Sequence, residues 1–157
     1  MDLRNIIITC LVILLTGSCK SVEFQSGLDG VKVEILDQNP EKIILKIVNS
    51  SEYSVAVEST QHLYLQRKVD DGWERVAYIP CACGTPCMEP RPKPIELGEK
   101  MEVTWDYISR GCTSGMPPET KESRVETGSY RLTFTLNPSK EGKRLNPEKL
   151  TVDFKVR

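Results

Sequence analysis

The chain has 157 residues and a formal net charge of −1, from 21 basic and 22 acidic residues and a single histidine, His62. Because the basic residues form no block, the electrostatic footprint of a nucleic-acid binder is missing, and we expect no nucleic acid among the partners. One histidine excludes zinc and catalytic sites that require two. The sequence also lacks a glycine-rich phosphate loop and a nucleophile elbow, so we expect a protein that is not an enzyme.

The N-terminal segment has the layout of a secretory signal peptide. Arg4 precedes an apolar run from Ile6 to Leu15, and small residues follow it. The run is far shorter than the roughly 20 residues that a membrane-spanning helix needs. We therefore predict that residues 1–18 are removed on export.

The segment Leu15-Thr-Gly-Ser-Cys19 resembles the lipobox of bacterial lipoproteins, in which cleavage exposes a cysteine that is then acylated. The usual box has leucine three residues before the cysteine, where this chain has Thr16. The resemblance implies a lipidated Cys19, a polar tether over residues 19–30 and a mature protein held in the bacterial cell envelope by acyl chains. Lys20, in place of aspartate, implies the outer membrane if the host has one. The alternative is ordinary secretory cleavage, which leaves Cys19 free.

From Val31 onward, apolar and polar residues alternate with the period of two that is typical of strands with one buried face. The pattern predicts seven or eight short strands and no helix of useful length. The clearest local signal is a hairpin from His62 to Ile79 around the turn Asp70-Asp-Gly72. Trp73 is expected to lie in the core or to cover a sheet. The side chains predicted to point inward are Val33, Leu45, Ile47, Leu63, Leu65, Val103, Trp105, Tyr130, Leu132, Phe134, Val152 and Phe154.

Three stretches interrupt the alternation. Residues 80–94 contain three cysteines and five prolines, and proline cannot donate a hydrogen bond to a sheet. Residues 109–127 hold Cys112 and the pair Pro117-Pro118, and residues 137–149 are mostly polar. The sequence therefore predicts loops or irregular backbone in all three stretches.

Strands with a single apolar face need a second sheet to bury that face, which favours an antiparallel β-sandwich. The phrases Leu65–Val76, Ile95–Asp106 and Gly128–Phe134 resemble, in this order, successive strands of bacterial immunoglobulin-like domains. The resemblance implies one immunoglobulin-like antiparallel β-sandwich of seven to eight strands over residues 31–157. The central phrase is also similar to the bacterial intracellular proteinase inhibitor family, which implies peptidase inhibition as an alternative function.

Four cysteines remain once the signal peptide and Cys19 are set aside, namely Cys81, Cys83, Cys87 and Cys112. An even number of cysteines in an exported protein favours disulfide bonds. A bond between Cys81 and Cys83 would close a strained ring, which leaves two pairings. These are Cys81–Cys87 with Cys83–Cys112, or Cys83–Cys87 with Cys81–Cys112. Either pairing ties the two cysteine-bearing loops together, a closure worth roughly 3 to 4 kcal/mol for about 30 residues.

The same four cysteines, with Met88 and Met116 nearby, also form a donor set that suits a soft ion such as Cu(I). The paired Cys-x2-Cys knuckles of structural zinc sites are absent. We expect instead no metal and no cofactor, and we expect the 80–94 and 109–127 loops to present a surface for a protein ligand. The sequence thus predicts a lipid-anchored binding or structural module, with copper binding and peptidase inhibition as alternatives.

Overall fold

The computed structural model describes residues 24–25, 28–58, 63–79, 81–87, 92 and 94–157. Over these ranges the chain is all-β and contains no helix, so no helix suited to crossing a membrane occurs there. Every pair of neighbouring strands is antiparallel. The all-β class that the alternating pattern predicted is therefore confirmed.

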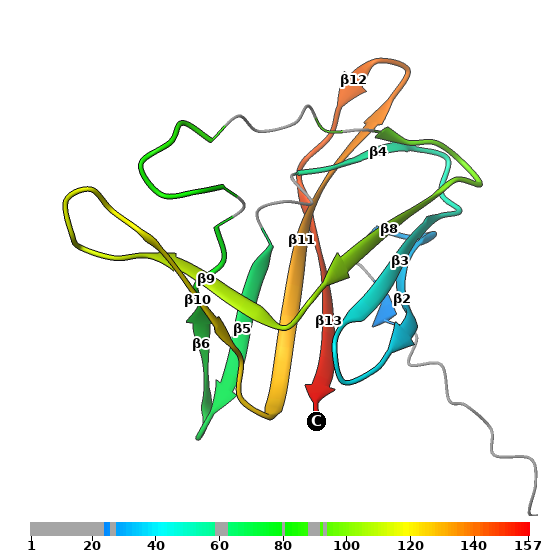
Figure 1. The fold of residues 1–157 in the computed structure, drawn as a ribbon. Coiled ribbons are helices and arrows are strands. Elements are labelled where there is room, and N and C mark those ends of the chain that lie inside the picture. Colours follow the sequence, from blue (N-terminus) through cyan, green and yellow to red (C-terminus); the bar gives the residue numbers. More distant parts are fainter. Residues whose placement is uncertain (1–23, 26–27, 59–62, 80, 88–91, 93) are drawn as a thin grey trace, which may run out of the picture.

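The first sheet has the strand order β1–β2–β3–β8 (Figure 1). Its strands are β1 (Phe24–Gln25), β2 (Val31–Gln38), β3 (Ile43–Asn49) and β8 (Lys100–Trp105). In β3 every second residue is buried from Ile43 to Asn49, including Leu45 and Ile47, which were predicted to point inward. Phe24 and Gln25 fall within the stretch expected to be a tether, yet they pair with Val33 and Lys32, so the sheet begins earlier than expected.

The second sheet is organised around one long strand, β11 (Gly128–Lys140). Along one edge, β11 pairs with β13 (Glu148–Val156) and with the short β12 (Lys143–Arg144). Its other edge pairs first with β5 (Tyr64–Val69) and then with β4 (Ser54–Val57). Outside these lie β6 (Gly72–Val76) and β7 (Pro94–Ile95). The predicted hairpin is confirmed as β5–β6, whereas His62 lies outside the described residues.

The two sheets bury their apolar faces against each other around Trp105. The Trp105 indole of the first sheet lies 5.7 Å from the ring of Tyr130 and 5.9 Å from that of Phe154, both in the second sheet. All twelve side chains that were predicted to point inward are buried. Tyr107, which follows β8, is also buried and was not predicted.

Two of the predicted irregular stretches are wrong in part. Within residues 109–127 the chain forms an antiparallel ribbon of β9 (Ile108–Cys112) and β10 (Thr120–Arg124). All five residues of β10 are exposed, so its sequence carries no apolar alternation. Likewise β11 continues through Pro138 as far as Lys140, well inside the predicted polar loop, because Pro138 pairs there with Val55 of β4.

Candidate binding surface

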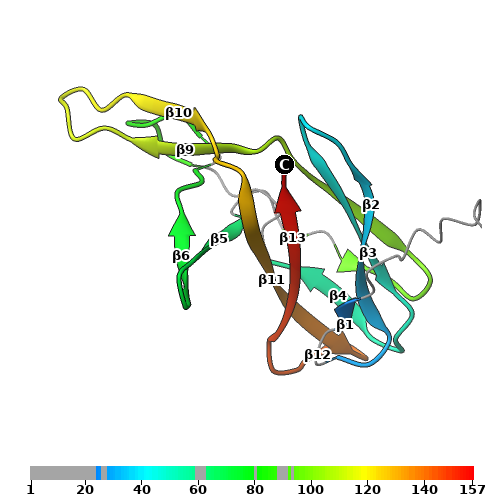
Figure 2. The ribbon, with the colours of Figure 1, turned by 90° about the horizontal axis from the view of Figure 1, so that it is seen from below.

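The β9–β10 ribbon projects beyond the two sheets, as the view in Figure 2 shows. Its base continues directly from the core, because the Val125 N–H donates a hydrogen bond to the carbonyl of the buried Tyr107. One side of β9 lies against the 77–79 segment. There the Arg110 N–H donates to the Ala77 carbonyl (2.9 Å), and the Ile79 N–H donates to the Arg110 carbonyl (3.2 Å). The ribbon is thus fixed to the end of the β5–β6 hairpin as well as to the core.

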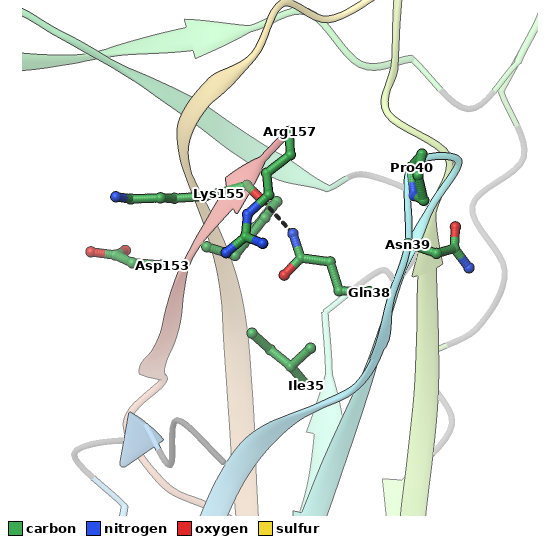
Figure 3. Close-up of a pocket in the computed structure, with 8 residues that line it drawn as sticks. Ile35, Gln38, Asn39, Pro40, Asp153, Lys155 and Arg157 are labelled. Atoms are coloured by element: carbon green, nitrogen blue, oxygen red, sulfur yellow. Dashed lines mark hydrogen bonds between the residues drawn. The ribbon is translucent and has the colours of Figure 1, made fainter. Parts of the chain in front are cut away.

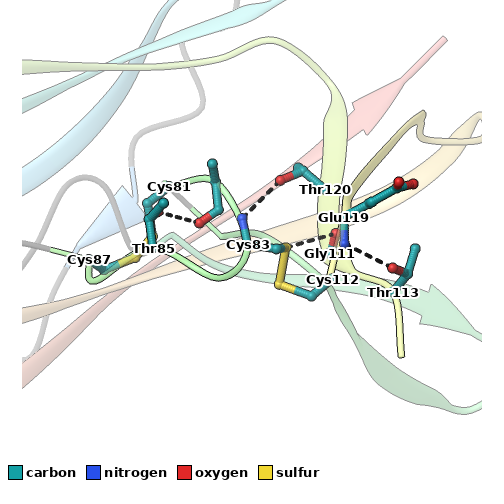
Figure 4. The surroundings of a disulfide bond; sticks show 10 residues. Cys81, Cys83, Thr85, Cys87, Gly111, Cys112, Thr113, Glu119 and Thr120 are labelled. Atoms are coloured by element: carbon teal, nitrogen blue, oxygen red, sulfur yellow. Dashed lines mark hydrogen bonds between the residues drawn. A yellow bond between two sulfur atoms is a disulfide. The ribbon is translucent and has the colours of Figure 1, made fainter. Parts of the chain in front are cut away.

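Two disulfide bonds hold the loop over residues 81–87, and one of them joins this loop to the ribbon (Figure 4). Cys81 bonds to Cys87 and Cys83 bonds to Cys112, with Cα–Cα distances of 5.8 and 5.6 Å, in the usual range for disulfides. This is one of the two pairings that the sequence left open. The first bond closes a small loop on itself, and the second fastens that loop to the far end of β9.

Hydrogen bonds and packing reinforce the second disulfide. The Cys83 N–H donates to the Thr120 hydroxyl at 3.0 Å, so the loop is bonded to β10 as well as to β9. Gly84 has a φ of +78°, and a Cβ at that position would lie 3.3 Å from the ring of Pro118. The loop over residues 81–87 therefore packs directly against Pro118 at the turn of the ribbon.

At the base of the ribbon, Arg110 is bonded to two carboxylates. Its guanidinium donates to Asp106 (2.5 and 3.2 Å) and to Glu122 (2.9 Å), and it lies 5.5 Å from the centre of the Tyr78 ring. The hydrogen bond to Asp106 raises the pKa of Arg110, although burial acts against it. Burial alone would raise the pKa of Asp106, but hydrogen bonds from Arg110 and the Ile108 N–H outweigh it and lower that pKa below its ordinary value. Paired in this way, the charges stabilise the ribbon's base.

The ends of the loop and of the ribbon carry no charge. Neither residues 81–87 nor residues 113–118 include an acidic or basic side chain, although 43 of the 157 residues in the chain are charged. Met116, at the turn of the ribbon, is fully exposed, and Pro86 and Pro117 are exposed too. We call residues 81–87 and 113–118 the ribbon surface. Its side chains are uncharged, and they combine apolar groups such as Met116 with the hydroxyls of Thr85, Thr113 and Ser114.

The four cysteines of the metal-binding alternative are bonded to one another in this arrangement. All four cysteine sulfurs are engaged in disulfides, so none is available as the thiolate that a soft metal ion requires. Among the described residues no group of three or more His, Cys, Asp or Glu side chains is placed to hold a metal ion. Met88 lies outside the described residues, as does Cys19, the predicted lipidation site.

A separate cavity of about 550 Å³ opens between β2 and β13 (Figure 3). Ile35 and Phe154 contribute apolar surface to it, and Arg157 contributes a cation. The Gln38 side-chain amide crosses the cavity and donates a hydrogen bond to the Lys155 carbonyl. This cavity was not predicted from the sequence, because its lining comes from residues 35–40 and 153–157, which become neighbours only when the two sheets pack.

Comparisons with protein-family models, with curated proteins and with solved structures returned no match for this chain.

Proposed function

We propose that the protein is an exported, lipid-anchored binding module without enzymatic activity, which holds a protein partner at the ribbon surface. The observation that carries this proposal is the locking of two uncharged, exposed turns into one unit by two disulfides, outside the core. A binding surface that is rigid beforehand loses little conformational entropy when a partner docks. An uncharged patch around an exposed methionine suits an apolar patch on another protein.

The fold that we propose for this module is an immunoglobulin-like β-sandwich. Two antiparallel sheets that bury Trp105, Tyr130 and Phe154 between them support this assignment, together with the order of the three sequence phrases. Sandwiches of this kind commonly carry recognition on the loops at their ends.

The proposed compartment is the bacterial cell envelope, with the mature protein anchored through acyl chains on Cys19. Disulfides persist in oxidising compartments, so the two bonds at the ribbon surface support export. The apolar run from Ile6 to Leu15 and the lipobox-like segment support the anchor.

A pull-down from detergent-solubilised envelopes tests the binding site. We expect the full-length protein to retain a partner, and we expect Met116→Glu to lose it, because the new carboxylate would be desolvated in an apolar contact. Leu145→Glu is the matched control, since Leu145 is an exposed apolar residue on a different turn. Loss of the partner in both variants, or in neither, would refute the ribbon surface as the binding site.

A further inference from the structure

The second sheet has an outer face, which points away from the core and forms a regular grid. Cross-strand pairing places Arg75, Gln66, Arg131 and Asp153 in one row across β6, β5, β11 and β13, which lie side by side in this order (Figure 1). Residues two positions away along each strand share that face. We call outer face the part of this surface over β5, β6, β13 and the N-terminal part of β11, which consists of Tyr64, Gln66, Lys68, Trp73, Arg75, Ser129, Arg131, Thr133, Thr135, Lys149, Thr151, Asp153 and Lys155.

This face is strongly basic in a chain whose net charge is −1. It carries five cations and a single carboxylate, and that carboxylate, Asp153, is bonded to Arg131 at 2.7 and 2.8 Å. No other described residue places a carboxylate within ion-pair distance of the remaining four cations, which are Lys68, Arg75, Lys149 and Lys155. An excess of unpaired positive charge on one face attracts an anionic partner.

Two aromatic rings lie among these cations. The Arg131 guanidinium is 4.1 Å from the centre of the Trp73 ring, and the Lys68 amine is 5.7 Å from it. Across the same strand pair, Arg75 lies 5.4 Å from the centre of the Tyr64 ring. These contacts hold both rings in place, yet Tyr64 remains 43% exposed and Trp73 is only half-buried. The face therefore combines fixed aromatic surface with positive charge.

The rest of the outer face is neutral and polar. Hydroxyl groups come from Ser129, Thr133, Thr135 and Thr151, and Gln66 adds an amide. Within the described part of this sheet, the one side-chain hydrogen bond between these neutral groups joins the hydroxyls of Thr133 and Thr151 at 3.2 Å. The face thus offers donors and acceptors to a ligand that is rich in hydroxyl groups.

We propose that the outer face binds an acidic polysaccharide, at a site distinct from the ribbon surface. A carboxylated sugar polymer matches each component: its acid groups meet the unpaired cations, its hydroxyls meet the threonines and Gln66, and the C–H face of a sugar ring packs on Trp73 or Tyr64. An extended peptide that binds by adding a strand needs an unpaired sheet edge, whereas the rings, hydroxyls and cations here lie on a face of paired strands. The observations therefore favour a glycan over an acidic peptide.

Binding of the full-length protein, in detergent, to immobilised polygalacturonate tests this proposal. We expect binding that weakens as salt is added, because exposed charges are screened, and no binding to neutral dextran. The triple variant Lys68→Gln/Arg75→Gln/Lys155→Gln should bind about tenfold more weakly. A matched triple variant, Lys100→Gln/Lys121→Gln/Lys143→Gln, removes the same charge from exposed sites off this face and should bind as the wild type does.

A second comparison separates a glycan from any other polyanion. Tyr64→Ala and Trp73→Ala should weaken binding to polygalacturonate severalfold while leaving any binding to polyglutamate unchanged, because only the sugar packs on the rings. The proposal is overturned if polygalacturonate does not bind, if the two triple variants lose affinity equally, or if polyglutamate binds as tightly as polygalacturonate. Circular dichroism of each variant shows whether its fold is intact. Because Tyr64 and Trp73 lie on different strands, each aromatic variant tests the stacking contact independently of the other.

Discussion

Trp105 lies where the two sheets meet, and its indole contacts three aromatic rings. Besides Tyr130 and Phe154, it packs edge-on against Tyr107 at 5.3 Å, and its N–H donates to the Ile108 carbonyl at 3.2 Å. The residue therefore fills the core and also fixes the start of β9. Trp73, by contrast, covers the outer face of the second sheet and contacts only cations among the ring interactions described.

The two tryptophans should differ in their contribution to stability. We expect Trp105→Ala to lower the free energy of unfolding by about 3 to 5 kcal/mol, because a large cavity is left in a close-packed core. Trp73→Ala should cost about 1 kcal/mol, the scale of an exposed cation–π contact. Urea denaturation followed by circular dichroism measures both. Equal losses for the two variants would contradict the assigned core.

Asp106 should make the stability of the fold depend on pH at the base of the ribbon. Its folded-state pKa lies below the ordinary value of 3.8, because the Arg110 and Ile108 hydrogen bonds to the carboxylate outweigh burial. A carboxyl group with a lowered pKa stabilises the fold above its unfolded-state pKa, and this stabilisation is lost as the pH falls through the folded-state pKa. Asp106→Asn should therefore be less stable than the wild type at neutral pH, and the difference should shrink below about pH 3.8.

The carboxyl carbon of Asp106, followed by NMR during an acid titration, measures this directly. We expect a midpoint below 3.8 in the wild type and a rise toward the ordinary value in Arg110→Gln, since the guanidinium donates the side-chain hydrogen bonds to that carboxylate. An unchanged midpoint in Arg110→Gln would show that the pair does not form in solution.

The burial of single residues could be predicted from the sequence where a strand has one buried face. All twelve side chains that alternation predicted to point inward are among the 21 buried hydrophobic residues of the core, because the period of two maps directly onto the two faces of a strand. It missed Tyr107, whose φ of +59° places it outside regular strand geometry between β8 and β9. It also missed the buried Asn49, whose amide donates to the Tyr53 and Ile95 carbonyls at 2.7 Å. A polar residue at a strand end looks like a turn in sequence, and only the fold supplies its partners.

Among the secondary-structure elements, the ribbon shows the limit of sequence patterns. Both faces of β10 are exposed, so the segment Thr120-Lys-Glu-Ser-Arg124 has no alternation of apolar and polar residues from which a strand could be predicted. Two features hold this strand instead, namely its backbone pairing with β9 and the Cys83 bond to Thr120.

The disulfide pairing could not be chosen from sequence for a related reason. Spacing in sequence permits two arrangements, and the position of β9 beside the 77–79 segment brings Cys83, rather than Cys81, to Cys112.

The two disulfides should contribute unequally to stability. In the chain-entropy estimate, Cys83–Cys112, with a separation of 29 residues, contributes roughly 3 to 4 kcal/mol, and Cys81–Cys87, with a separation of 6, contributes about 2 kcal/mol. We therefore expect Cys83→Ser/Cys112→Ser to be the less stable of the two paired variants in urea denaturation. The opposite order would show that the small loop, and not its attachment to β9, stabilises this region.

Hydrogen exchange on the same variants locates the effect. Loss of Cys83–Cys112 should expose the amides of β9 and β10 to exchange, while the amides of β11 and β13, whose pairing runs from Gly128 to Leu136, stay protected. Non-reducing peptide mapping of the wild type supplies the control, since it should recover the Cys81–Cys87 and Cys83–Cys112 peptides. Recovery of Cys81 bonded to Cys112 would contradict the pairing.

Over the whole molecule, the core and the two proposed surfaces are separate. The core between the sheets follows from alternation alone, so the fold class was predictable from sequence. The ribbon surface was predicted only as a pair of joined loops, and the choice of disulfide pairing and the exposure of its two turns required the structure. The outer face was not predicted at all, because its cations and rings come from four strands that are up to 91 positions apart, from Tyr64 to Lys155.

We propose that the protein holds its partner at the ribbon surface. Site-specific photo-crosslinking in intact cells tests it most directly, with a photoreactive amino acid at position 116 and, as the control, at position 145, both of which are exposed. We expect one protein to be crosslinked from position 116 and none from position 145. The crosslink from position 116 should be lost when Cys83 and Cys112 are both replaced by serine. The same protein captured from both positions, or no capture from position 116, would contradict it.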